Sequence, residues 1–186
     1  MDLGIKNKIA LITASSKGLG KATALTLSKE GCKVIINGRN ESTLKQVAEE
    51  ISSITKNEIF YKSANLSKQS EVESLVDFVI KTFGTIHILV TNSGGPKPGN
   101  FNDINSNDWY DGFDNTVMSV YTLIKKSLPY MKNQRWGRIV NITSVSVKQP
   151  LDGLLLSNSL RMSVIGLAKS LSNEFSQYNI LINNVC

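Results

Sequence analysis

The chain has 186 residues, of which 41% are hydrophobic and 19% charged, and its formal net charge at pH 7 is +6. This composition is typical of a soluble globular protein, and the length suffices for one domain with a sizeable core. No apolar run approaches the roughly 20 residues that span a bilayer, and residues 1–6 lack the apolar core of a signal peptide. We therefore expect one domain covering residues 1–186, in a cytoplasmic protein with no membrane partner.

The basic charge is spread along the chain, which carries 21 Lys and Arg against 15 Asp and Glu. Its densest group surrounds the end of one predicted helix, where cations are favourable in any case. The residues of that group are Lys125, Lys126, Lys132, Arg135 and Arg138. Because no nucleic-acid module is recognisable, the charge favours an anionic cofactor or substrate over nucleic acid. A plain solvated surface explains most of these side chains equally well.

Cysteine and histidine give no sign of a metal site. The two cysteines, Cys32 and Cys186, have neither metal-ligand spacing nor the pattern of a disulfide framework. The single histidine, His87, stands beside an apolar run and is interpreted as a residue at the start of a strand. We expect no bound metal.

Short apolar runs alternate along the chain with segments of helical apolar spacing. Strands are predicted at residues 9–12, 33–39, 58–61, 86–91, 138–142 and 180–185. Helices are predicted at residues 21–30, around 44–51, around 72–80, at 108–132 and at 155–178, with a loop at 97–107. This order predicts an α/β fold with a doubly wound parallel sheet, covered on both faces by helices.

A turn of small residues joins the first predicted strand to the first predicted helix. It reads Thr13, Ala14, Ser15, Ser16, Lys17, Gly18, Leu19 and Gly20. Small side chains let the backbone approach a pyrophosphate, and a helix N-terminus presents free N–H groups and partial positive charge to it. A turn that serves packing alone is the alternative.

Four more polar residues fall at or just past the ends of predicted strands. They are Arg39, Asn65, Asn92 and Ser144. In an open parallel sheet, ligands bind beyond the carboxyl ends of the strands. These residues and the small-residue turn therefore predict one continuous binding rim.

The turn resembles the T-G-x-x-x-G-x-G turn of the short-chain dehydrogenase/reductase family, with Ala14 in the first glycine position. Residues 92–94, Asn-Ser-Gly, are similar to the N-N-A-G segment of that family, and residues 137–144 to its G-R-I-V-N-I-S-S strand. The resemblance covers the whole chain and points to 3-oxoacyl-(acyl-carrier-protein) reductase-like members. It implies a Rossmann fold whose usual C-terminal strand and substrate lid are absent here, so we expect a C-terminally incomplete domain.

The resemblance also assigns a cofactor site. It implies nicotinamide dinucleotide contacts from Thr13, Ser15, Ser16, Lys17, Gly18, Leu19, Gly20, Arg39, Asn65, Leu66, Asn92, Ser93 and Gly94. Arg39 ends the second strand, where an Arg accommodates a 2′-phosphate and an acidic residue would bind a 2′-hydroxyl. With Lys17 nearby, the expectation is NADP(H) in preference to NAD(H), although each cation taken singly is compatible with an ordinary surface charge.

The catalytic positions depart from the family pattern of Asn, Ser, Tyr and Lys. Ser144 matches the serine, but Ser157 stands at the Tyr position, Arg161 at the Lys position and Thr116 at the Asn position, beside Asn115. A serine hydroxyl is a far weaker acid than a phenol. Arg161 can bind the nicotinamide ribose and stabilise negative charge, but its high pKa prevents it from relaying protons.

Two functions follow from the resemblance. The first is an NADP(H)-dependent oxidoreductase that interconverts a carbonyl and an alcohol in a small-molecule substrate, with acyl-carrier-linked substrates among the options. The alternative is a catalytically weak or silent relative that binds the dinucleotide as a sensor or scaffold. Relatives pair their two long helices, so a homodimer or homotetramer is expected, with Leu123, Val164 and Leu167 as apolar residues in excess of what one sheet face needs.

Overall fold

A six-stranded, entirely parallel sheet forms the centre of the computed structural model, which describes all residues Met1–Cys186. Its strands are β1 (Ile9–Ile12), β2 (Lys33–Gly38), β3 (Ile59–Ser63), β4 (Ile88–Thr91), β5 (Gly137–Ile142) and β6 (Ile180–Val185). They lie in the order β3-β2-β1-β4-β5-β6. This order confirms the doubly wound sheet.

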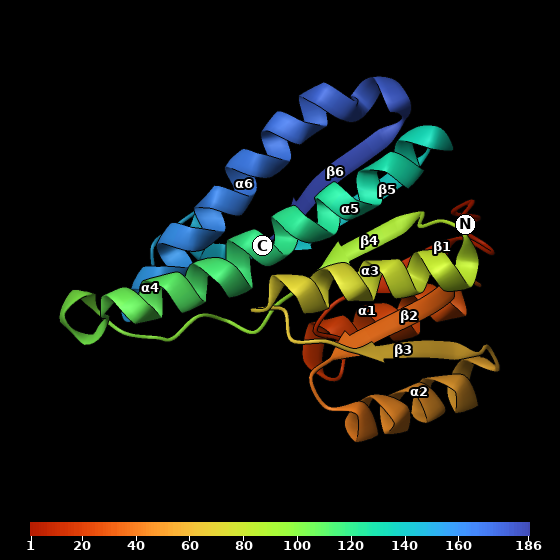
Figure 1. Cartoon of the computed structure of the whole chain (residues 1–186), viewed down its shortest axis with the longest axis horizontal. Helices are drawn as coiled ribbons and strands as arrows, with labels where there is room; N and C mark the ends of the chain where they lie inside the picture. The colour runs from red at the N-terminus through yellow and green to blue at the C-terminus, as the bar shows by residue number, and fades with distance from the viewer.

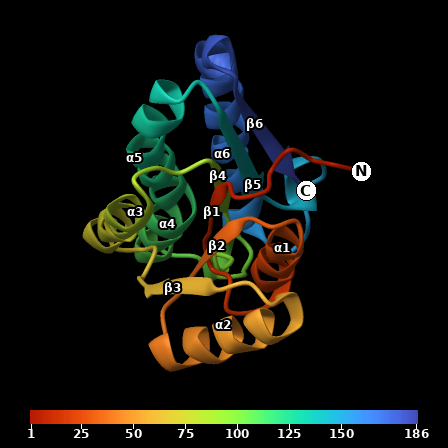
Figure 2. The ribbon, with the colours of Figure 1, turned by 90° about the vertical axis from the view of Figure 1, so that its right-hand side faces the viewer.

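Helices cover both faces of this sheet. The helices are α1 (Gly18–Lys29), α2 (Glu41–Thr55), α3 (Gln69–Phe83), α4 (Ser106–Phe113), α5 (Ser119–Asn133) and α6 (Leu155–Phe175). Helices α1 and α2 lie on one face, and α3, α5 and α6 lie on the other (Figures 1 and 2). None of the helices is long and apolar enough to cross a membrane.

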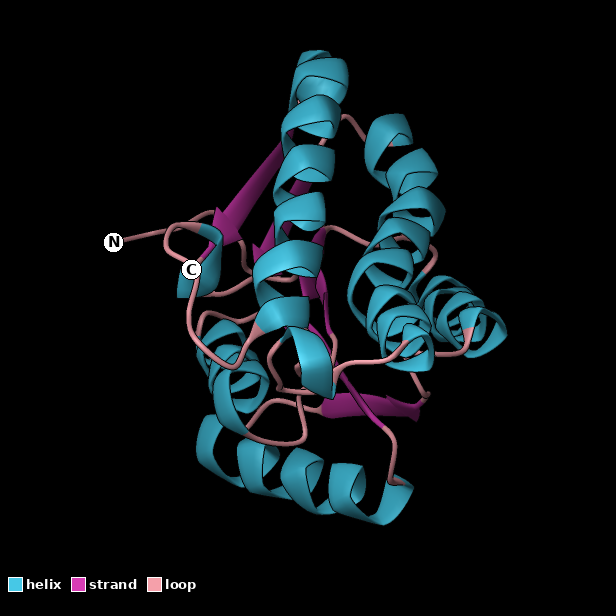
Figure 3. Ribbon diagram, turned by 90° about the vertical axis from the view of Figure 1, so that its left-hand side faces the viewer, coloured by secondary structure: helices cyan, strands magenta, loops and turns pink.

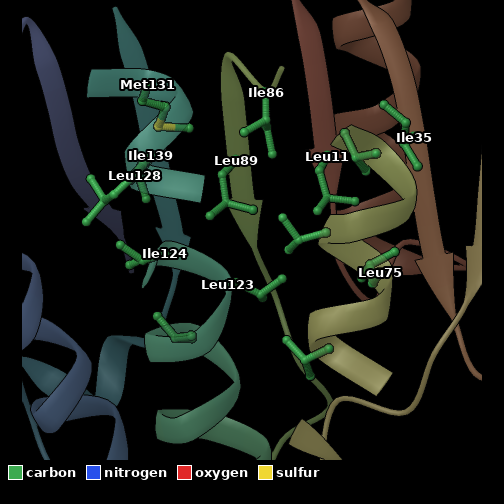
Figure 4. Close-up of a cluster of buried hydrophobic side chains, with 14 of the residues drawn as sticks. Leu11, Ile35, Leu75, Ile86, Leu89, Leu123, Ile124, Leu128, Met131 and Ile139 are labelled. Atoms are coloured by element: carbon green, nitrogen blue, oxygen red, sulfur yellow. The ribbon is translucent and has the colours of Figure 1, made fainter. Parts of the chain in front are cut away.

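Two apolar clusters hold these layers together. A cluster of 21 buried residues fills the space between the sheet and α3, α5 and α6, with Leu11, Leu89 and Leu123 among its members (Figure 4). A second cluster of 13 buried residues lies on the side of α1 and α2 and includes Ala10 and Ile12. Successive β1 residues thus enter opposite clusters, because side chains alternate across a strand. A strand buried on both faces is what a continuous apolar run predicts.

The sheet contains one topological switch point. Chain connections lead from β1 to β2 and β3 on one side, whereas β4 lies on the other side of β1. The connections that leave β1 and β4 therefore diverge, which opens a crevice at the carboxyl ends of these two strands.

The helix predicted at residues 108–132 is not continuous. Helix α4 begins earlier, at Ser106, because the side-chain oxygen of Asn105 caps it by accepting a hydrogen bond from the backbone N–H of Asp108. A π-helical turn, Asp114–Met118, then separates α4 from α5. Such a turn inserts one residue into the helix and rotates the following side chains around the axis. The predicted loop at 97–107 also contains a short 3₁₀ turn, Phe101–Asp103.

Candidate functional site

A cleft of about 460 Å³ lies at the carboxyl ends of β1, β2, β3 and β4. Ten residues that the sequence assigned to cofactor binding line it: Ser16, Lys17, Gly18, Leu19, Arg39, Asn65, Leu66, Asn92, Ser93 and Gly94. The remaining lining residues are Ala14, Asn37, Gly38, Ala64, Ser67, Gly95 and Asn115. The fold therefore brings residues from five separate stretches of sequence to one cleft.

Ala14 adopts a left-handed backbone conformation, with φ +44°. This conformation costs a residue with a Cβ atom about 1–2 kcal/mol, so neighbouring groups must hold it. The side-chain oxygen of Asn37 accepts a hydrogen bond from the Ala14 N–H (3.3 Å), and the side-chain amide of Asn92 donates one to the Ala14 carbonyl (3.2 Å). The turn is thus clamped between the ends of β2 and β4.

Gly20 lets helix α1 begin directly against this turn. A Cβ atom at Gly20 would lie 2.6 Å from the Ala14 carbonyl oxygen, closer than any side chain can come. At the helix start, Lys17 provides no side-chain cap, and the first turn contains no acidic residue. The N–H groups of that turn are therefore available to an anion in the cleft, and the helix dipole favours one there.

Thr13 and Ser15 do not line the cleft, in contrast to the sequence-based assignment. Both are fully buried. The Thr13 hydroxyl donates to the Asn92 carbonyl (2.7 Å) and accepts from its N–H (2.8 Å). The Ser15 hydroxyl donates to the Ile12 carbonyl (2.7 Å) and accepts from the Asn37 N–H (2.9 Å). Thr13, Ser15 and Gly20 therefore shape the turn without lining the cleft. The two hydroxyls do so by hydrogen bonding the turn to a neighbouring strand or its end.

Lys17 and Arg39 are the only charged residues on the cleft wall. Both are exposed, and neither forms an ion pair. Two unpaired cations in a hollow without a carboxylate create a positive local field. The cleft therefore favours an anionic ligand.

Asn65 shapes the part of the cleft wall that follows β3. Its backbone N–H donates to a carboxylate oxygen of Glu71 (2.7 Å), and its side-chain oxygen accepts from the Ser67 N–H (3.1 Å). The bond from Asn65, together with the ammonium of Lys68, lowers the pKa of Glu71. These contacts fix the segment that follows β3, so Asn65 and Leu66 are held at the cleft wall.

The four residues at the predicted catalytic positions lie outside the cleft. Ser157 and Arg161 are 9% exposed and Thr116 is 2% exposed, whereas Ser144 is half-buried. One guanidinium nitrogen of Arg161 donates to the carbonyls of Ile142 and Thr143, at 3.2 Å each. Arg161 therefore binds the end of β5 and does not line the cleft at which it was expected to bind ribose. No carboxylate pairs with it, and burial lowers its pKa.

Ser157, which the sequence analysis placed at the tyrosine position of the family, forms a hydroxyl pair with Ser146. The Ser157 oxygen lies 3.3 Å from that of Ser146, which is itself buried. The Ser144 oxygen accepts a hydrogen bond from the Ser146 N–H (3.1 Å) and caps a short 3₁₀ turn. Sequence reasoning missed Ser146, since a serine two residues after a motif carries no signal of its own.

The π-helical turn decides which side chain reaches the cleft from the helix. Asn115 lines the cleft, and its side-chain amide donates to the Gly94 carbonyl (2.9 Å). Thr116, which the sequence placed at the Asn position of the family, points into the interior. Asn37 was also missed, although a polar residue within an apolar strand was a usable signal.

Comparison with known proteins gives a consistent result. A family model described as short chain dehydrogenase matches residues 8–186. The chain is 33% identical over 185 residues to an uncharacterized oxidoreductase, YvrD, of Bacillus subtilis, covering 100% of this chain and 69% of that protein. It is also 33% identical over 180 residues to the 3-oxoacyl-(acyl-carrier-protein) reductase FabG of Staphylococcus epidermidis, covering 96% and 73%.

Solved structures give the same picture. L-sorbose reductase from Gluconobacter frateurii, complexed with NADPH and L-sorbose, superposes with a TM-score of 0.95 at 27% identity, covering 99% of this chain and 70% of that one. An actinorhodin polyketide ketoreductase variant with NADPH superposes with a TM-score of 0.91 at 28% identity, covering 97% and 69%.

Proposed function

The chain belongs to the short-chain dehydrogenase family, and we propose that it is an NADP(H)-dependent oxidoreductase that interconverts a carbonyl group and an alcohol. One observation carries the cofactor part of this proposal. The cleft combines an uncapped helix start with two unpaired cations, Lys17 and Arg39, and contains no carboxylate. An acidic residue at the end of β2 would instead suit the ribose 2′-hydroxyl of NAD(H).

The lining of the cleft fits a phosphorylated dinucleotide. The turn around Gly18, open on the cleft side, would hold the pyrophosphate at the start of α1. Arg39 and Lys17 would bind the 2′-phosphate, and Asn65 and Leu66 would lie near the adenine. When bound, the cofactor supplies or accepts a hydride, which this set of side chains cannot do.

A small ketone, or its alcohol, is the proposed substrate. FabG is named for reducing 3-oxoacyl groups on a carrier protein, and the Gluconobacter enzyme is an L-sorbose reductase. Both names describe the reduction of a ketone to an alcohol. For this chain we propose that reaction class, with acyl-carrier-linked ketones among its substrates.

The chain's own contribution to the chemistry would come from its hydroxyl groups. Ser144 is half-buried at the end of β5 and can orient a carbonyl by donating a hydrogen bond. Ser157 can hold a proton close to the same strand end, but a serine hydroxyl releases it reluctantly near neutral pH. Arg161 holds the end of β5 in place and keeps its own proton.

A catalytically weak or silent relative is the second candidate. The burial of Ser157, Arg161 and Thr116 inside the protein favours it. Such a protein would bind the dinucleotide as a sensor or scaffold. The cofactor cleft serves both functions equally, so only the chemistry distinguishes them.

A turnover assay with a binding control separates the two candidates. Purified protein would first be titrated with NADPH, and oxidation of NADPH would then be followed with a panel of small ketones and a 3-oxoacyl thioester. Turnover of a ketone supports the oxidoreductase. Saturable NADPH binding without turnover of any panel member supports the silent relative, and failure to bind NADPH removes both.

We also propose that the protein forms a homodimer or homotetramer through α5 and α6. Leu123 and Val164, expected to face a partner, are buried in the core of the same chain, and Leu167 packs partly against it. A different surface supports pairing. An apolar groove of about 450 Å³ runs along α5 and α6, which lie next to each other (Figure 3). Its lining includes Tyr121, Leu128, Pro129, Leu171 and Phe175.

A further inference from the structure

A second hollow, here called the side pocket, adjoins the cofactor cleft. It has a volume of about 120 Å³ and lies between the start of α3 and the π-helical turn. Leu66 and Ser67 line both the cleft and the side pocket, so they form a shared wall. The remaining lining residues are Gln69, Asp114, Met118 and Ser119. A ligand that lies against Leu66 in the cleft is therefore next to the side pocket.

The side pocket is opposite in charge to the cleft. Asp114 is the only charged residue on its wall, whereas Lys17 and Arg39 are the only charged residues on the cleft wall. Asp114 is exposed and forms no ion pair. An ionised carboxylate can only accept hydrogen bonds, so it requires a donor. The side pocket therefore favours an amino group and disfavours a phosphate.

The rest of the lining suits a flat ring. Leu66 and Met118 supply apolar surface, and Ser67 and Gln69 supply polar atoms beside it. The Ser119 hydroxyl already donates to a backbone carbonyl of the π-helical turn (2.7 Å). Apolar surface with a few fixed polar groups is typical of a small-molecule site. A heteroaromatic ring that carries an amino group fits this combination.

The π-helical turn places the carboxylate in the side pocket. Asp114 is the first residue of the turn, and its backbone carbonyl accepts a hydrogen bond from the Ser119 N–H. The next two residues lie elsewhere: Asn115 lines the cleft, and Thr116 is buried. Two consecutive side chains of the turn thus line two adjoining hollows, with the carboxylate of Asp114 in one and the amide of Asn115 in the other.

We infer that Asp114 selects the base of the dinucleotide by accepting a hydrogen bond from the 6-amino group of adenine. This inference rests on the proposed function, in which the adenine lies near Leu66. In hypoxanthine a carbonyl oxygen replaces the amino group, so two acceptors would face each other and repel. Asp114 therefore discriminates between dinucleotides that differ at this single position of the base.

Titration with two matched ligands tests this selection without any need for turnover. The ligands are NADPH and its hypoxanthine analogue, reduced nicotinamide hypoxanthine dinucleotide phosphate, and fluorescence of the reduced nicotinamide reports the binding of both. A hydrogen bond to a charged group predicts that the wild type binds NADPH roughly ten- to a hundredfold more tightly than the analogue. Asp114→Asn removes the charge and offers an N–H donor to the hypoxanthine carbonyl, so the two affinities should become nearly equal.

Asp111→Asn is the matched control, because Asp111 is an exposed carboxylate on α4 that lines neither hollow. It should keep the ratio of the wild type. The ratio compares two ligands in the same protein, so partial unfolding of a variant does not alter it.

Two results would overturn the role of Asp114 and leave the proposed function standing. They are equal affinities of the wild type for NADPH and the analogue, and a ratio in Asp114→Asn that is as large as in the wild type. Failure of the wild type to bind NADPH at all would instead remove the proposed function, and the selection of adenine with it.

Discussion

At the scale of single residues, the proposed preference for NADP(H) rests on Arg39. It is exposed at the end of β2, lines the cleft with Lys17 and has no ion-pair partner. A guanidinium forms bidentate hydrogen bonds with phosphate, so it gains more from a 2′-phosphate than from a 2′-hydroxyl. Under the proposed function, this position would discriminate between the two nicotinamide cofactors without any change in the rest of the cleft.

Arg39→Ala should weaken NADPH binding and leave NADH binding nearly unchanged. A hydrogen bond to a charged group contributes about 1.5–3 kcal/mol, so the dissociation constant for NADPH should rise roughly ten- to a hundredfold. Fluorescence titration of both cofactors measures this. Lys169→Ala, which removes an exposed cation from α6, serves as the control. An equal loss of NADH affinity would mean that Arg39 supports the cleft itself.

Under the proposed function, Ser157 and Arg161 would be the residues that limit the rate of reduction. The double variant Ser157→Tyr with Arg161→Lys restores an acidic phenol and the cation that lowers its pKa. General acid catalysis contributes about 10²–10⁴-fold, so we expect the rate on a simple ketone to rise at least tenfold. The variant should also be less stable by about 1–3 kcal/mol, because Arg161 gives up its bonds to the Ile142 and Thr143 carbonyls.

The comparison requires unchanged NADPH affinity in the double variant. A variant that binds NADPH normally but is no faster would show that the wild type has its own proton donor. If the wild type already turns over quickly and the double variant is slower, Ser157 and Arg161 are an adaptation, and the catalytically silent function is excluded.

At the scale of secondary-structure elements, the strands and most helices were predictable from apolar periodicity. The continuous runs in β1 and β2 and the spacing of Leu44, Val47 and Ile51 in α2 specify their burial directly. The π-helical turn was not predictable, since the insertion of one residue leaves no mark in a helical pattern. This turn places Asn115 on the cleft wall and Thr116 in the interior, and the sequence gives no sign of that arrangement.

The burial of Thr13 and Ser15 could not be predicted from the sequence for a related reason. A motif shows which residues form a turn, but the direction of each hydroxyl depends on partners far away in sequence. Thr13 bonds to Asn92, and Ser15 bonds to Asn37. Asn37 lies on β2 and Asn92 directly follows β4, so both contacts form only when the sheet is assembled.

His87 joins the start of β4 to β1 and should make stability depend on pH. Its Nδ1 accepts a hydrogen bond from the Ile9 N–H (3.2 Å), which requires an unprotonated nitrogen. Burial and, to a lesser extent, the nearby ammonium of Lys8 lower its pKa in the folded state. The unfolded chain therefore binds a proton more readily, and stability present above about pH 6.5 is lost as the pH falls toward the lower folded-state pKa.

Because His87 is the only histidine, His87→Gln should remove most of this dependence. The glutamine side chain can still accept a hydrogen bond but does not titrate. Chemical denaturation of both proteins at about pH 7 and about pH 5.5 measures how far the free energy of unfolding falls between the two pH values. If the free energy of unfolding falls equally in the wild type and in His87→Gln, the pH dependence comes from other groups.

At the scale of the whole molecule, the sheet order explains why the four segments at the ends of β1, β2, β3 and β4 meet in the cleft, where Asn115 of the π-helical turn joins them. The switch of direction at β1 and β4 opens the crevice, and the turns that leave the strands line it. The apolar groove along α5 and α6 is a second surface feature and shares no lining residue with the cleft. A stable interface buries about 1,200–2,000 Å² in total, and the groove offers an apolar centre for one.

Light scattering of the wild type at micromolar concentration should show a dimer or tetramer. Tyr121→Lys adds a third cation to the groove, which Lys125 and Lys132 already line, and should shift the protein toward the monomer. Tyr110→Lys is the control, because Tyr110 is an exposed aromatic residue on α4 outside the groove. A monomeric wild type, or an equal effect of both variants, would refute pairing through α5 and α6.

The most direct test of the central claim is the ratio of the two cofactor affinities in the unmodified protein. Isothermal titration with NADPH and with NADH, in the same buffer at physiological salt, gives both dissociation constants. The unpaired cations Lys17 and Arg39 predict that NADPH binds at least about tenfold more tightly. Equal affinities for NADPH and NADH, or tighter binding of NADH, would contradict the assignment of this cleft to NADP(H).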